Sequence, residues 1–233
     1  MTGFFRDEWN KTARMIDRLV PLFLVVPLIF EVTLNMFTYF GSRLVNGSRV
    51  HADLTIPADA WFPLIPWTVV IYIGAFALWI INYILACHQD TETAYRLLSA
   101  DFAAKIVCLL CFMILPTTNV RPEIAGDGFW EMGMQLLYAA DAADNLFPSI
   151  HCLTSTFCVI AVRENPRIPV WYKVFSLLFA AAICVSTLTT KQHVVVDVIA
   201  GVLLAEGSYL AVRATGFDRA YGRLMSRLFR RTT

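Results

Sequence analysis

The residues with the clearest chemical potential are His193 and Asp197, which lie four positions apart at the start of a long apolar segment. On a helix this spacing places both side chains on one face, so the carboxylate can hold one ring nitrogen of the imidazole and leave the other free to react. Ionisable side chains are costly in apolar surroundings, which favours a function for the pair. The alternative is a structural pair that ties two membrane helices together.

A second candidate site lies in the segment Phe147-Pro148-Ser149-Ile150-His151. Proline fits the first turn of a helix, so Ser149 and His151 are expected where free backbone amides and the positive end of the helix dipole attract phosphate. Because apolar segments begin at His151 and at His193, both histidines are expected at the same level of the membrane. Two histidines, a carboxylate, an arginine and a lysine are the groups that phosphoryl transfer through a phosphohistidine needs.

The composition determines the kind of protein that must position these residues. Hydrophobic residues make up 58% of the 233 residues, charged residues make up 16%, and the mean hydropathy is positive. This exceeds what a soluble domain needs to fill its core and indicates an integral membrane protein. The apolar runs fall at about residues 19–40, 62–86, 94–115, 148–163, 170–189 and 193–213. The sequence therefore predicts an all-α, polytopic membrane protein, a bundle of six transmembrane helices in a single domain.

The distribution of positive charge predicts the orientation of this bundle. With six spans and a cytoplasmic N-terminus, fourteen Lys and Arg residues fall in inner segments and four in outer segments, with Lys105 left inside a span. Such a bias is typical of cytoplasmic loops and termini. We therefore expect a plasma or inner membrane protein with both termini in the cytoplasm and an active site at the outer face. The inner residues are Arg6, Lys11, Arg14, Arg18, Arg96, Arg163, Arg167, Lys173, Arg213, Arg219, Arg223, Arg227, Arg230 and Arg231, and the outer ones are Arg43, Arg49, Arg121 and Lys191.

The single domain, residues 1–233, divides into three parts on this scheme. They are a charged cytoplasmic lead over residues 1–18, a six-helix core over residues 19–213 and a cytoplasmic tail over residues 214–233. In the tail, arginine recurs every four residues from Arg219, which is typical of a basic amphipathic helix on anionic lipids. The extracytoplasmic loop over residues 116–147 has an apolar centre, which predicts a short helix that lies on the bilayer or caps a cavity.

The apolar runs contain three further charges of interest. Asp101 and Lys105 are four residues apart, so an ion pair can close on one helix face. The pair is either a buried relay or phosphate contact, or a self-neutralising pair that avoids burying either charge alone, and we favour the second interpretation. Glu31 in the first run is interpreted as a structural partner rather than a catalyst. Cys108 and Cys111 have no neighbouring His or Cys cluster that would complete a metal site.

The order and spacing of these residues resemble the type 2 phosphatidic acid phosphatase superfamily, whose motifs are Lys-x6-Arg-Pro, Pro-Ser-Gly-His and Ser-Arg-x5-His-x3-Asp. The first motif is matched by Arg121-Pro122 alone, and the second by Pro148-Ser149-Ile150-His151. The third is matched by Ser186-Thr187 followed by His193 and Asp197 at the family spacing. The resemblance extends over about residues 94–213, including the placement of the motifs at the ends of apolar runs.

Two of the cationic positions of the family differ in this chain. Ile114 occupies the position of the first-motif lysine, and Thr187 occupies that of the third-motif arginine. Lys191 is the expected replacement, and Lys105 is a weaker one because it lies about two helical turns too deep. The Phe-Pro-Ser-x-His segment looks more like the branch that contains inositol phosphorylceramide and sphingomyelin synthases, which makes transfer to an alcohol an alternative to hydrolysis, the reaction that we expect first.

The resemblance implies a role for each candidate residue. His193 is the expected nucleophile, Asp197 orients it, and His151 protonates the leaving alcohol and then activates the acceptor. Arg121, Lys191 and Ser149, with helix-terminal amides, are expected to bind the phosphate and stabilise the transition state. The resemblance implies no metal and no cofactor.

The expected function is an integral membrane phosphatase or phosphotransferase that acts on a lipid phosphate, a lipid diphosphate or a phospholipid headgroup. The partners are the lipid substrate and the bilayer, and nucleic acid is not expected. One alternative is a phosphoalcohol headgroup transferase similar to inositol phosphorylceramide synthase. Two alternatives belong to other classes. One is a transporter that uses the buried charges, although the sequence lacks the inverted repeats that are common in transporters. The other is a catalytically silent lipid-binding scaffold.

Overall fold

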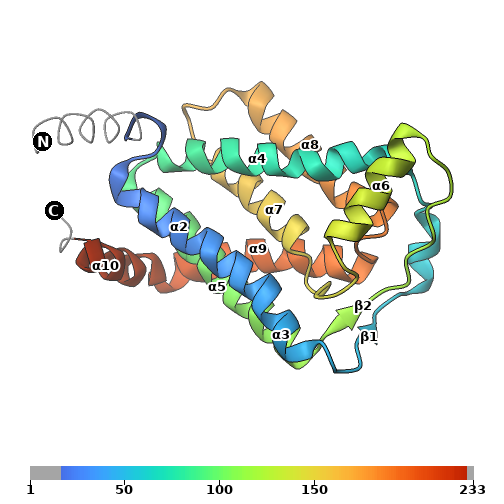
Figure 1. Cartoon of the computed structure of the whole chain (residues 1–233). Helices are drawn as coiled ribbons and strands as arrows, with labels where there is room; N and C mark the ends of the chain where they lie inside the picture. Colours follow the sequence, from blue (N-terminus) through green and yellow to red (C-terminus); the bar gives the residue numbers. More distant parts are fainter. Residues whose placement is uncertain (1–16, 230–233) are drawn as a thin grey trace, which may run out of the picture.

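The computed structural model describes residues 17–229, so nearly all of the expected cytoplasmic lead and the last residues of the tail lie outside the described part (Figure 1). The described chain is nearly all α-helical, with one two-residue pair of strands. Its α-helices are α2 (Leu22–Met36), α3 (Ser42–Asn46), α4 (Val69–Cys87), α5 (Thr91–Ile114), α6 (Phe129–Ala140), α7 (Ile150–Arg163), α8 (Val170–Thr189), α9 (Val195–Thr215) and α10 (Phe217–Phe229). Between them lie a π-helical turn η1 (Phe37–Gly41), 3-10 turns η2 (Pro57–Trp61) and η3 (Pro66–Thr68), and strands β1 (Ala52–Asp53) and β2 (Thr117–Thr118).

Five helical segments are long and apolar enough to cross a membrane, which fits the expected multi-pass protein. They are Leu22–Asn46, Pro66–Cys87, Thr91–Ile114, Val170–Thr189 and Val195–Thr215. The remaining expected span, residues 148–163, forms α7, which has 14 residues. At 1.5 Å per residue such a helix is about 21 Å long, short of the ~30 Å hydrocarbon core of a bilayer. By length, five helices of the described residues can cross a membrane, and the expected count of six spans is not confirmed.

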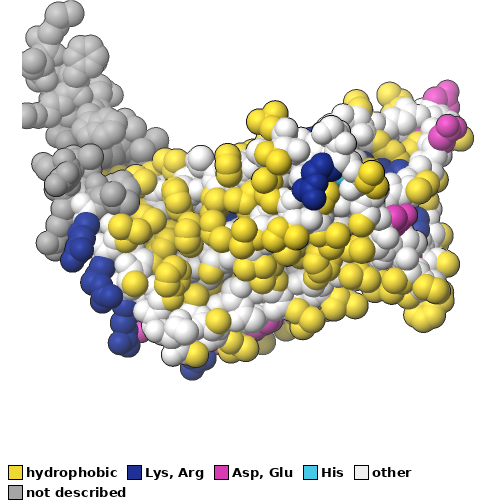
Figure 2. Space-filling view, turned by 90° about the horizontal axis from the view of Figure 1, so that it is seen from below, with side chains coloured by type: hydrophobic (Ala, Val, Ile, Leu, Met, Phe, Trp, Pro, Cys, Tyr) yellow, Lys and Arg dark blue, Asp and Glu magenta, His cyan; other side chains and the backbone are white. Residues whose placement is uncertain are grey.

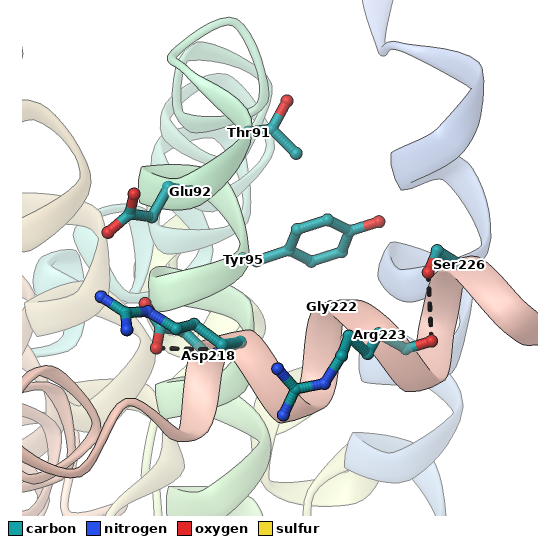
Figure 3. Close-up of a pocket in the computed structure, with 8 residues that line it drawn as sticks. Thr91, Glu92, Tyr95, Asp218, Gly222, Arg223 and Ser226 are labelled. Atoms are coloured by element: carbon teal, nitrogen blue, oxygen red, sulfur yellow. Dashed lines mark hydrogen bonds between the residues drawn. The ribbon is translucent and has the colours of Figure 1, made fainter.

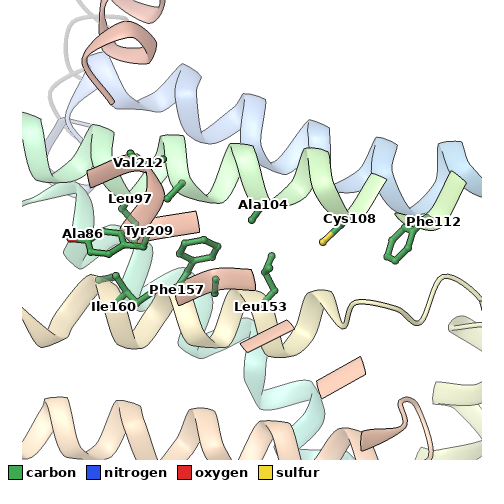
Figure 4. Close-up of a cluster of buried hydrophobic side chains, with 13 residues drawn as sticks. Ala86, Leu97, Ala104, Cys108, Phe112, Leu153, Phe157, Ile160, Tyr209 and Val212 are labelled. Carbon is green, nitrogen blue, oxygen red and sulfur yellow. The ribbon is translucent and has the colours of Figure 1, made fainter. Parts of the chain in front are cut away.

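The short helix α7 lies inside the bundle, packed against α4, α8 and α9. A buried cluster joins α7 to α5 and α9, with Leu153 and Phe157 of α7 meeting Ala104 and Cys108 of α5 (Figure 4). Lipid has no access to this interface. The outer surfaces of the surrounding helices carry large exposed apolar side chains instead, among them Val32, Ile80, Leu178 and Leu203. Figure 2 shows such side chains over the middle of one face, with Lys and Arg gathered at the end beside α10 and acidic side chains mainly at the opposite end.

A glycine lets α7 and α9 approach closely at the ends where the two histidines lie. A Cβ atom at Gly201 of α9 would lie 2.5 Å from the backbone oxygen of Ser149 and 3.2 Å from the Cβ of Cys152. Real Cβ atoms do not approach a backbone oxygen that closely, so only glycine permits this packing. The backbone N–H of Ser149 in turn donates to the backbone oxygen of Asp197 at 3.1 Å. The first turns of α7 and α9 are therefore joined directly by their backbones.

The loops at this end of the bundle are tied together by β1 and β2. The strands pair in parallel, Ala52 with Thr117 and Asp53 with Thr118. This pairing connects the segment after α3 with the start of the long segment between α5 and α7. The short helix predicted within that segment is present as α6, which packs against η3 and α4.

At the other end, α9 is followed by α10 across Gly216, which has a φ of +67°. That conformation favours glycine and allows the sharp change of direction between the two helices. The expected amphipathic helix of the tail is thus present, and part of its apolar face packs on the protein. Tyr221 and Met225 are buried in a cluster with Leu24 of α2 and Leu98 of α5.

Candidate functional site

His193 lies in the turn between α8 and α9, two residues before the first residue of α9. The carbonyl oxygen of Thr187, in the last turn of α8, accepts hydrogen bonds from the backbone N–H of Gln192 at 2.9 Å and of His193 at 3.1 Å. These bonds fold the chain back sharply after α8, and Lys191 adopts a left-handed conformation with a φ of 56° to complete the turn. The histidine is therefore held by backbone hydrogen bonds rather than by a regular helix.

The expected pairing of His193 with Asp197 is present in this geometry. His193 Nδ1 lies 3.4 Å from Asp197 Oδ2, a long contact, and the same oxygen accepts a hydrogen bond from the backbone N–H of Val194 at 3.0 Å. Asp197 thus caps the start of α9 and at the same time faces the imidazole. Its second oxygen, Oδ1, is buried and has no hydrogen-bond partner among residues 17–229. The side chains of both residues are almost fully buried.

His151 occupies the first turn of α7, and its ring centroid lies 6.3 Å from that of His193. Its ring stacks on Tyr72 of α4 at a centroid distance of 4.3 Å and lies 5.1 Å from the ring of Trp79. His151 Nδ1 lies 3.3 Å from the hydroxyl of Tyr72. The other ring nitrogen, Nε2, is buried and finds no hydrogen-bond partner in the described part of the chain. The structure therefore brings the two histidines together and leaves one nitrogen of His151 unused.

Ser149 is the N-cap of α7, so the helix begins at Ile150 and Pro148 precedes it instead of lying in its first turn as expected. Its Oγ accepts a hydrogen bond from the backbone N–H of Cys152 at 3.3 Å, and the residue is fully buried. The hydroxyl is thus engaged in capping the helix. The backbone hydrogen bond from Ser149 to Asp197 holds Ser149 next to the site.

Arg121 is held next to the residue that precedes His193. One of its terminal nitrogens donates to the side-chain oxygen of Gln192 at 2.6 Å and to the backbone oxygen of Ala142 at 3.2 Å. The other terminal nitrogen donates to the backbone oxygen of Asp141. The guanidinium also lies over the ring of Tyr138, 5.0 Å from its centroid. Gln192, which the sequence gave no reason to single out, is the contact that links Arg121 to the histidine turn.

Lys191 lines a small cavity of about 110 Å³ together with His193. Its ammonium group donates to the backbone oxygen of Phe62. Its own carbonyl accepts a hydrogen bond from the side-chain amide of Asn119 at 3.0 Å. An ammonium group has three N–H bonds, so Lys191 keeps donors for a second partner.

The turn around Lys191 is also fixed from α6. The hydroxyl of Tyr138 donates to the backbone oxygen of Thr190 at 3.0 Å. Burial raises the pKa of this hydroxyl, an effect that the nearby Arg121 opposes only in part, so Tyr138 stays a hydrogen-bond donor at neutral pH. The helix predicted in the loop therefore covers the site and anchors its backbone.

Asp59 also lines this cavity, although the sequence indicated only an outer loop at this position. Its Oδ1 accepts a hydrogen bond from the backbone N–H of Val195 at 2.7 Å, and its Oδ2 accepts one from Ile56 at 2.8 Å. The first amide of α9 is thus occupied by a carboxylate. Sequence patterns cannot reveal this contact because it joins residues that are 136 positions apart.

Lys105 lies in a buried group of charges that does not include the histidines. Its ammonium lies 2.8 Å from Asp101 Oδ2 and 3.5 Å from Glu31 Oε2. The hydroxyls of Tyr83 and Tyr221 donate to Asp101 at 2.7 Å and to Glu31 at 3.2 Å. The ion pair between Asp101 and Lys105 that the sequence favoured is therefore present, and Glu31 of α2 joins it as a second carboxylate. Lys105 is not among the residues that line the cavity beside His193.

A second, larger cavity of about 420 Å³ lies between the start of α5 and α10. Figure 3 shows its lining, with Tyr95 of α5 facing Gly222 and Arg223 of α10. It begins beyond the C-terminal end of α9, whereas His193 precedes the N-terminal end, so the two cavities are separated by a helix about 30 Å long. No histidine and no cysteine line this larger cavity. The smaller cavity, which His193 and Lys191 line, marks the candidate site.

The residues of the candidate site define what it can do chemically. Within residues 17–229, no group of three or more His, Cys, Asp and Glu side chains is placed to hold a metal ion. The site instead combines an imidazole backed by a carboxylate, a second imidazole with an unused nitrogen, and two cations. Such a set can support nucleophilic attack and proton transfer at a phosphate.

Comparisons with known proteins agree with this chemistry. A search of curated proteins finds no match to the chain. The sequence profile of the PAP2 superfamily matches residues 48–211, which include α4 to α8, most of α9 and every residue of the candidate site. Since this match extends over more than half of the chain, the protein belongs to the PAP2 superfamily, the type 2 phosphatidic acid phosphatases, a family of phosphatase-type lipid phosphoesterases.

Proposed function

We propose that this protein is an integral membrane phosphatase or phosphotransferase that acts on a lipid phosphate, a lipid diphosphate or a phospholipid headgroup through a phosphohistidine. The observation that carries the proposal is the pairing of two imidazoles with different surroundings. His193 faces the carboxylate of Asp197, and His151 lies 6.3 Å away between ring centroids with Nε2 unpartnered in the described residues. One ring is thus prepared to attack and the other to transfer protons.

In the first step, His193 Nε2 attacks the phosphorus atom while the bond from phosphorus to the leaving oxygen breaks. Asp197 accepts the proton of Nδ1 in a hydrogen bond and stabilises the positive charge that develops on the ring. His151 donates the proton of its Nε2 to the leaving oxygen, which departs as an alcohol from a phosphate ester or as a lipid phosphate from a lipid diphosphate. The products of this step are a phosphohistidine at His193 and a neutral His151.

In the second step, His151 Nε2 takes a proton from water or from an acceptor alcohol. The oxygen of that acceptor attacks the phosphorus, and the bond between phosphorus and His193 Nε2 breaks. Water as the acceptor gives hydrolysis, and an alcohol gives a new phosphodiester or phosphomonoester. His151 ends the cycle protonated and ready for the next leaving group.

Arg121, Lys191 and Ser149 are proposed to bind the phosphate oxygens. Lys191 keeps free N–H bonds beyond its contact with Phe62, and the Nε of Arg121 is buried with no partner within the described range. These unused donors support the assignment because charge-assisted hydrogen bonds are the strongest contacts for a phosphate. Lys105 remains the weaker candidate, since it is already engaged by two carboxylates.

Transfer to an alcohol, as in a headgroup transferase, is favoured as the second candidate by the lining of the small cavity. Asp59 and Asn119 lie there beside Lys191 and His193. A carboxylate repels a free phosphate ion but accepts hydrogen bonds from hydroxyl groups, so this lining suits a polyhydroxyl headgroup or acceptor. The Phe-Pro-Ser-x-His segment supports the same candidate.

The orientation is proposed from the charge distribution and the topology. The start of α2 and the end of α10 lie at the same end of the bundle (Figure 1), which requires an even number of crossings. Five long helices and the short, enclosed α7 together provide six. The excess of Lys and Arg at that end supports a topology with both termini in the cytoplasm and the histidines at the extracytoplasmic side of a plasma or inner membrane.

The test is a substrate panel with the purified protein in lipid nanodiscs. Lipid phosphates, lipid diphosphates and phospholipids are supplied with and without alcohol acceptors, and phosphate release and new phosphodiesters are measured separately. We expect turnover of at least one substrate and its loss in His193→Ala. Turnover by folded His193→Ala equal to that of the unaltered protein would refute the mechanism, and ion or lipid transport without turnover would favour a transporter.

A further inference from the structure

A hydrogen-bonded chain leads from His151 to a carboxylate outside the residues considered so far. His151 Nδ1 lies 3.3 Å from the hydroxyl oxygen of Tyr72, and this hydroxyl lies 3.0 Å from Asp141 Oδ2. Tyr72 is fully buried on α4, and Asp141 is the C-cap of α6. Three separate elements, α4, α6 and α7, therefore contribute one member each.

The chain has a direction because a phenol has only one proton. A carboxylate oxygen can only accept, so the Tyr72 proton points to Asp141 and its oxygen is left to accept from His151. The Nδ1 of His151 must then carry a proton. In the neutral ring, Nε2 is consequently the unprotonated nitrogen, and Nε2 is the atom without a hydrogen-bond partner in the described chain.

Asp141 is held in place from several sides. Its Oδ1 accepts a hydrogen bond from the hydroxyl of Tyr39 in η1, and its backbone oxygen accepts one from Arg121. Arg43 of α3 donates to the same Tyr39 hydroxyl at 2.6 Å and lies 2.7 Å from the neighbouring Asp144. A carboxylate with fixed partners on both oxygens is a rigid acceptor rather than a mobile surface charge.

We propose that Tyr72 and Asp141 are positioning residues that hold His151 in the Nδ1-protonated tautomer and stabilise its doubly protonated form. The inference rests on the proposed role of His151 as the acid and base of the reaction. When Nε2 takes up a proton, the positive charge of the ring is delocalised toward Nδ1, where the Tyr72 oxygen and, behind it, the Asp141 carboxylate face it. Tyr72 also fixes the plane of the ring by stacking.

Few titratable or charged groups face His151. The titratable and charged groups that face it are Tyr72 from α4, Asp141 from the end of α6 and His193 from the turn before α9, with Arg121 on the far side of Tyr72. Its other aromatic neighbours, Phe76 and Trp79, do not titrate in this range. Asp141 is the only carboxylate that a hydrogen-bonded chain joins to His151 within the described residues.

The kinetic test uses Tyr72→Phe, which keeps the stacked ring and removes the hydroxyl. We expect kcat to fall about 10- to 100-fold with little change in KM, because Tyr72 is buried and is not among the residues that line the cavity beside His193. We also expect the alkaline limb of the pH profile to move about one pH unit lower, because the protonated ring loses its charge-assisted hydrogen bond. Asp141→Asn should move the limb in the same direction, since it keeps the shape and removes the charge.

Tyr83→Phe is the matched control. It removes another buried phenol that donates to a carboxylate, Asp101, in the charge group away from the histidines. It should alter thermal stability about as much as Tyr72→Phe and leave the pH profile unchanged. If Tyr72→Phe also leaves the pH profile unchanged at normal folding, or if Tyr83→Phe moves it equally, the positioning role is refuted.

The tautomer is measured directly, without turnover, by ¹⁵N NMR of histidine-labelled protein in nanodiscs, with His151→Ala used for assignment. We expect the Nδ1–H tautomer for neutral His151 and a mixture of both tautomers in Tyr72→Phe. An Nε2–H tautomer in the unaltered protein would refute the inference. This result separates the two proposals, because a protein that lacks all phosphoryl transfer but shows the expected tautomer contradicts the proposed function alone.

Discussion

Replacement of Lys191 by alanine tests the assignment of the phosphate-binding cation. Lys191 lines the cavity beside His193 and uses only one of its N–H bonds on Phe62. Position 191 has a φ of 56°, a left-handed conformation that carries the same steric cost for alanine as for lysine because both have a Cβ atom. The turn should therefore keep its conformation. The change then removes the charge and the contact with Phe62 without relieving backbone strain.

The magnitude follows from the kind of contact that is lost. A charge-assisted hydrogen bond made in the transition state is worth about 2 to 4 kcal/mol, so kcat/KM should fall about 30- to 1000-fold. Lys191→Arg should keep most of the activity because it keeps the positive charge, although the planar guanidinium directs its N–H bonds differently from an ammonium group. The measurement is kcat/KM for the best lipid substrate in nanodiscs, with thermal unfolding of each variant recorded alongside.

Lys105→Ala separates this assignment from its alternative. Removing Lys105 leaves Asp101 and Glu31 buried without their cation, which typically costs 3–5 kcal/mol of stability. We therefore expect a less stable protein that retains activity where it is folded. If Lys191→Ala has full activity while folded Lys105→Ala has none, the phosphate is bound from α5 and the reasoning from the small cavity is wrong.

Three further predictions follow from the same site. His151→Ala should turn over very slowly and retain a phosphohistidine at His193, detected as phosphate label that is bound to the protein and released by acid. Normal turnover by this variant would contradict the proton-transfer role of His151. Activity should persist in excess EDTA, and its loss with recovery on adding magnesium or zinc would reveal a metal requirement. Gly201→Ala should lower both the unfolding temperature and activity, because its Cβ meets the Ser149 oxygen, whereas Gly207→Ala, with open space around it, should not.

The sequence predicted the helices well, together with the proximity of His193 to Asp197 and His151, while the chemical roles of these side chains stay predictions. Long apolar runs dominate the local signal, and the spacing of His193 and Asp197 brings them together even though His193 precedes the helix, because Asp197 caps the same turn. The family resemblance is confirmed over most of the chain. The run at residues 148–163 matches α7 closely, but it could not show that this helix is enclosed, since an apolar run does not reveal whether a helix faces lipid or other helices.

The sequence could not predict the partners that are distant in the chain. Asp59 on Val195, Gln192 on Arg121 and Tyr72 on His151 all join segments that only the tertiary fold brings together. The surroundings of Thr187 show the same limit. Its side chain is fully buried and donates to Cys184, and its carbonyl accepts two bonds from the histidine turn, so the arginine of the family motif has no space here.

The backbone bond from Ser149 to Asp197 has a consequence for how the site can diversify. It joins the first turns of α7 and α9 through atoms that every amino acid has, and Gly201 holds the helices at the same distance. The separation of the two imidazoles therefore does not depend on the loops that surround the cavity. Substitutions in η2, α6 or the segment around Asn119 can change the shape and polarity of the space offered to a substrate while the distance over which the phosphoryl group and proton move stays constant.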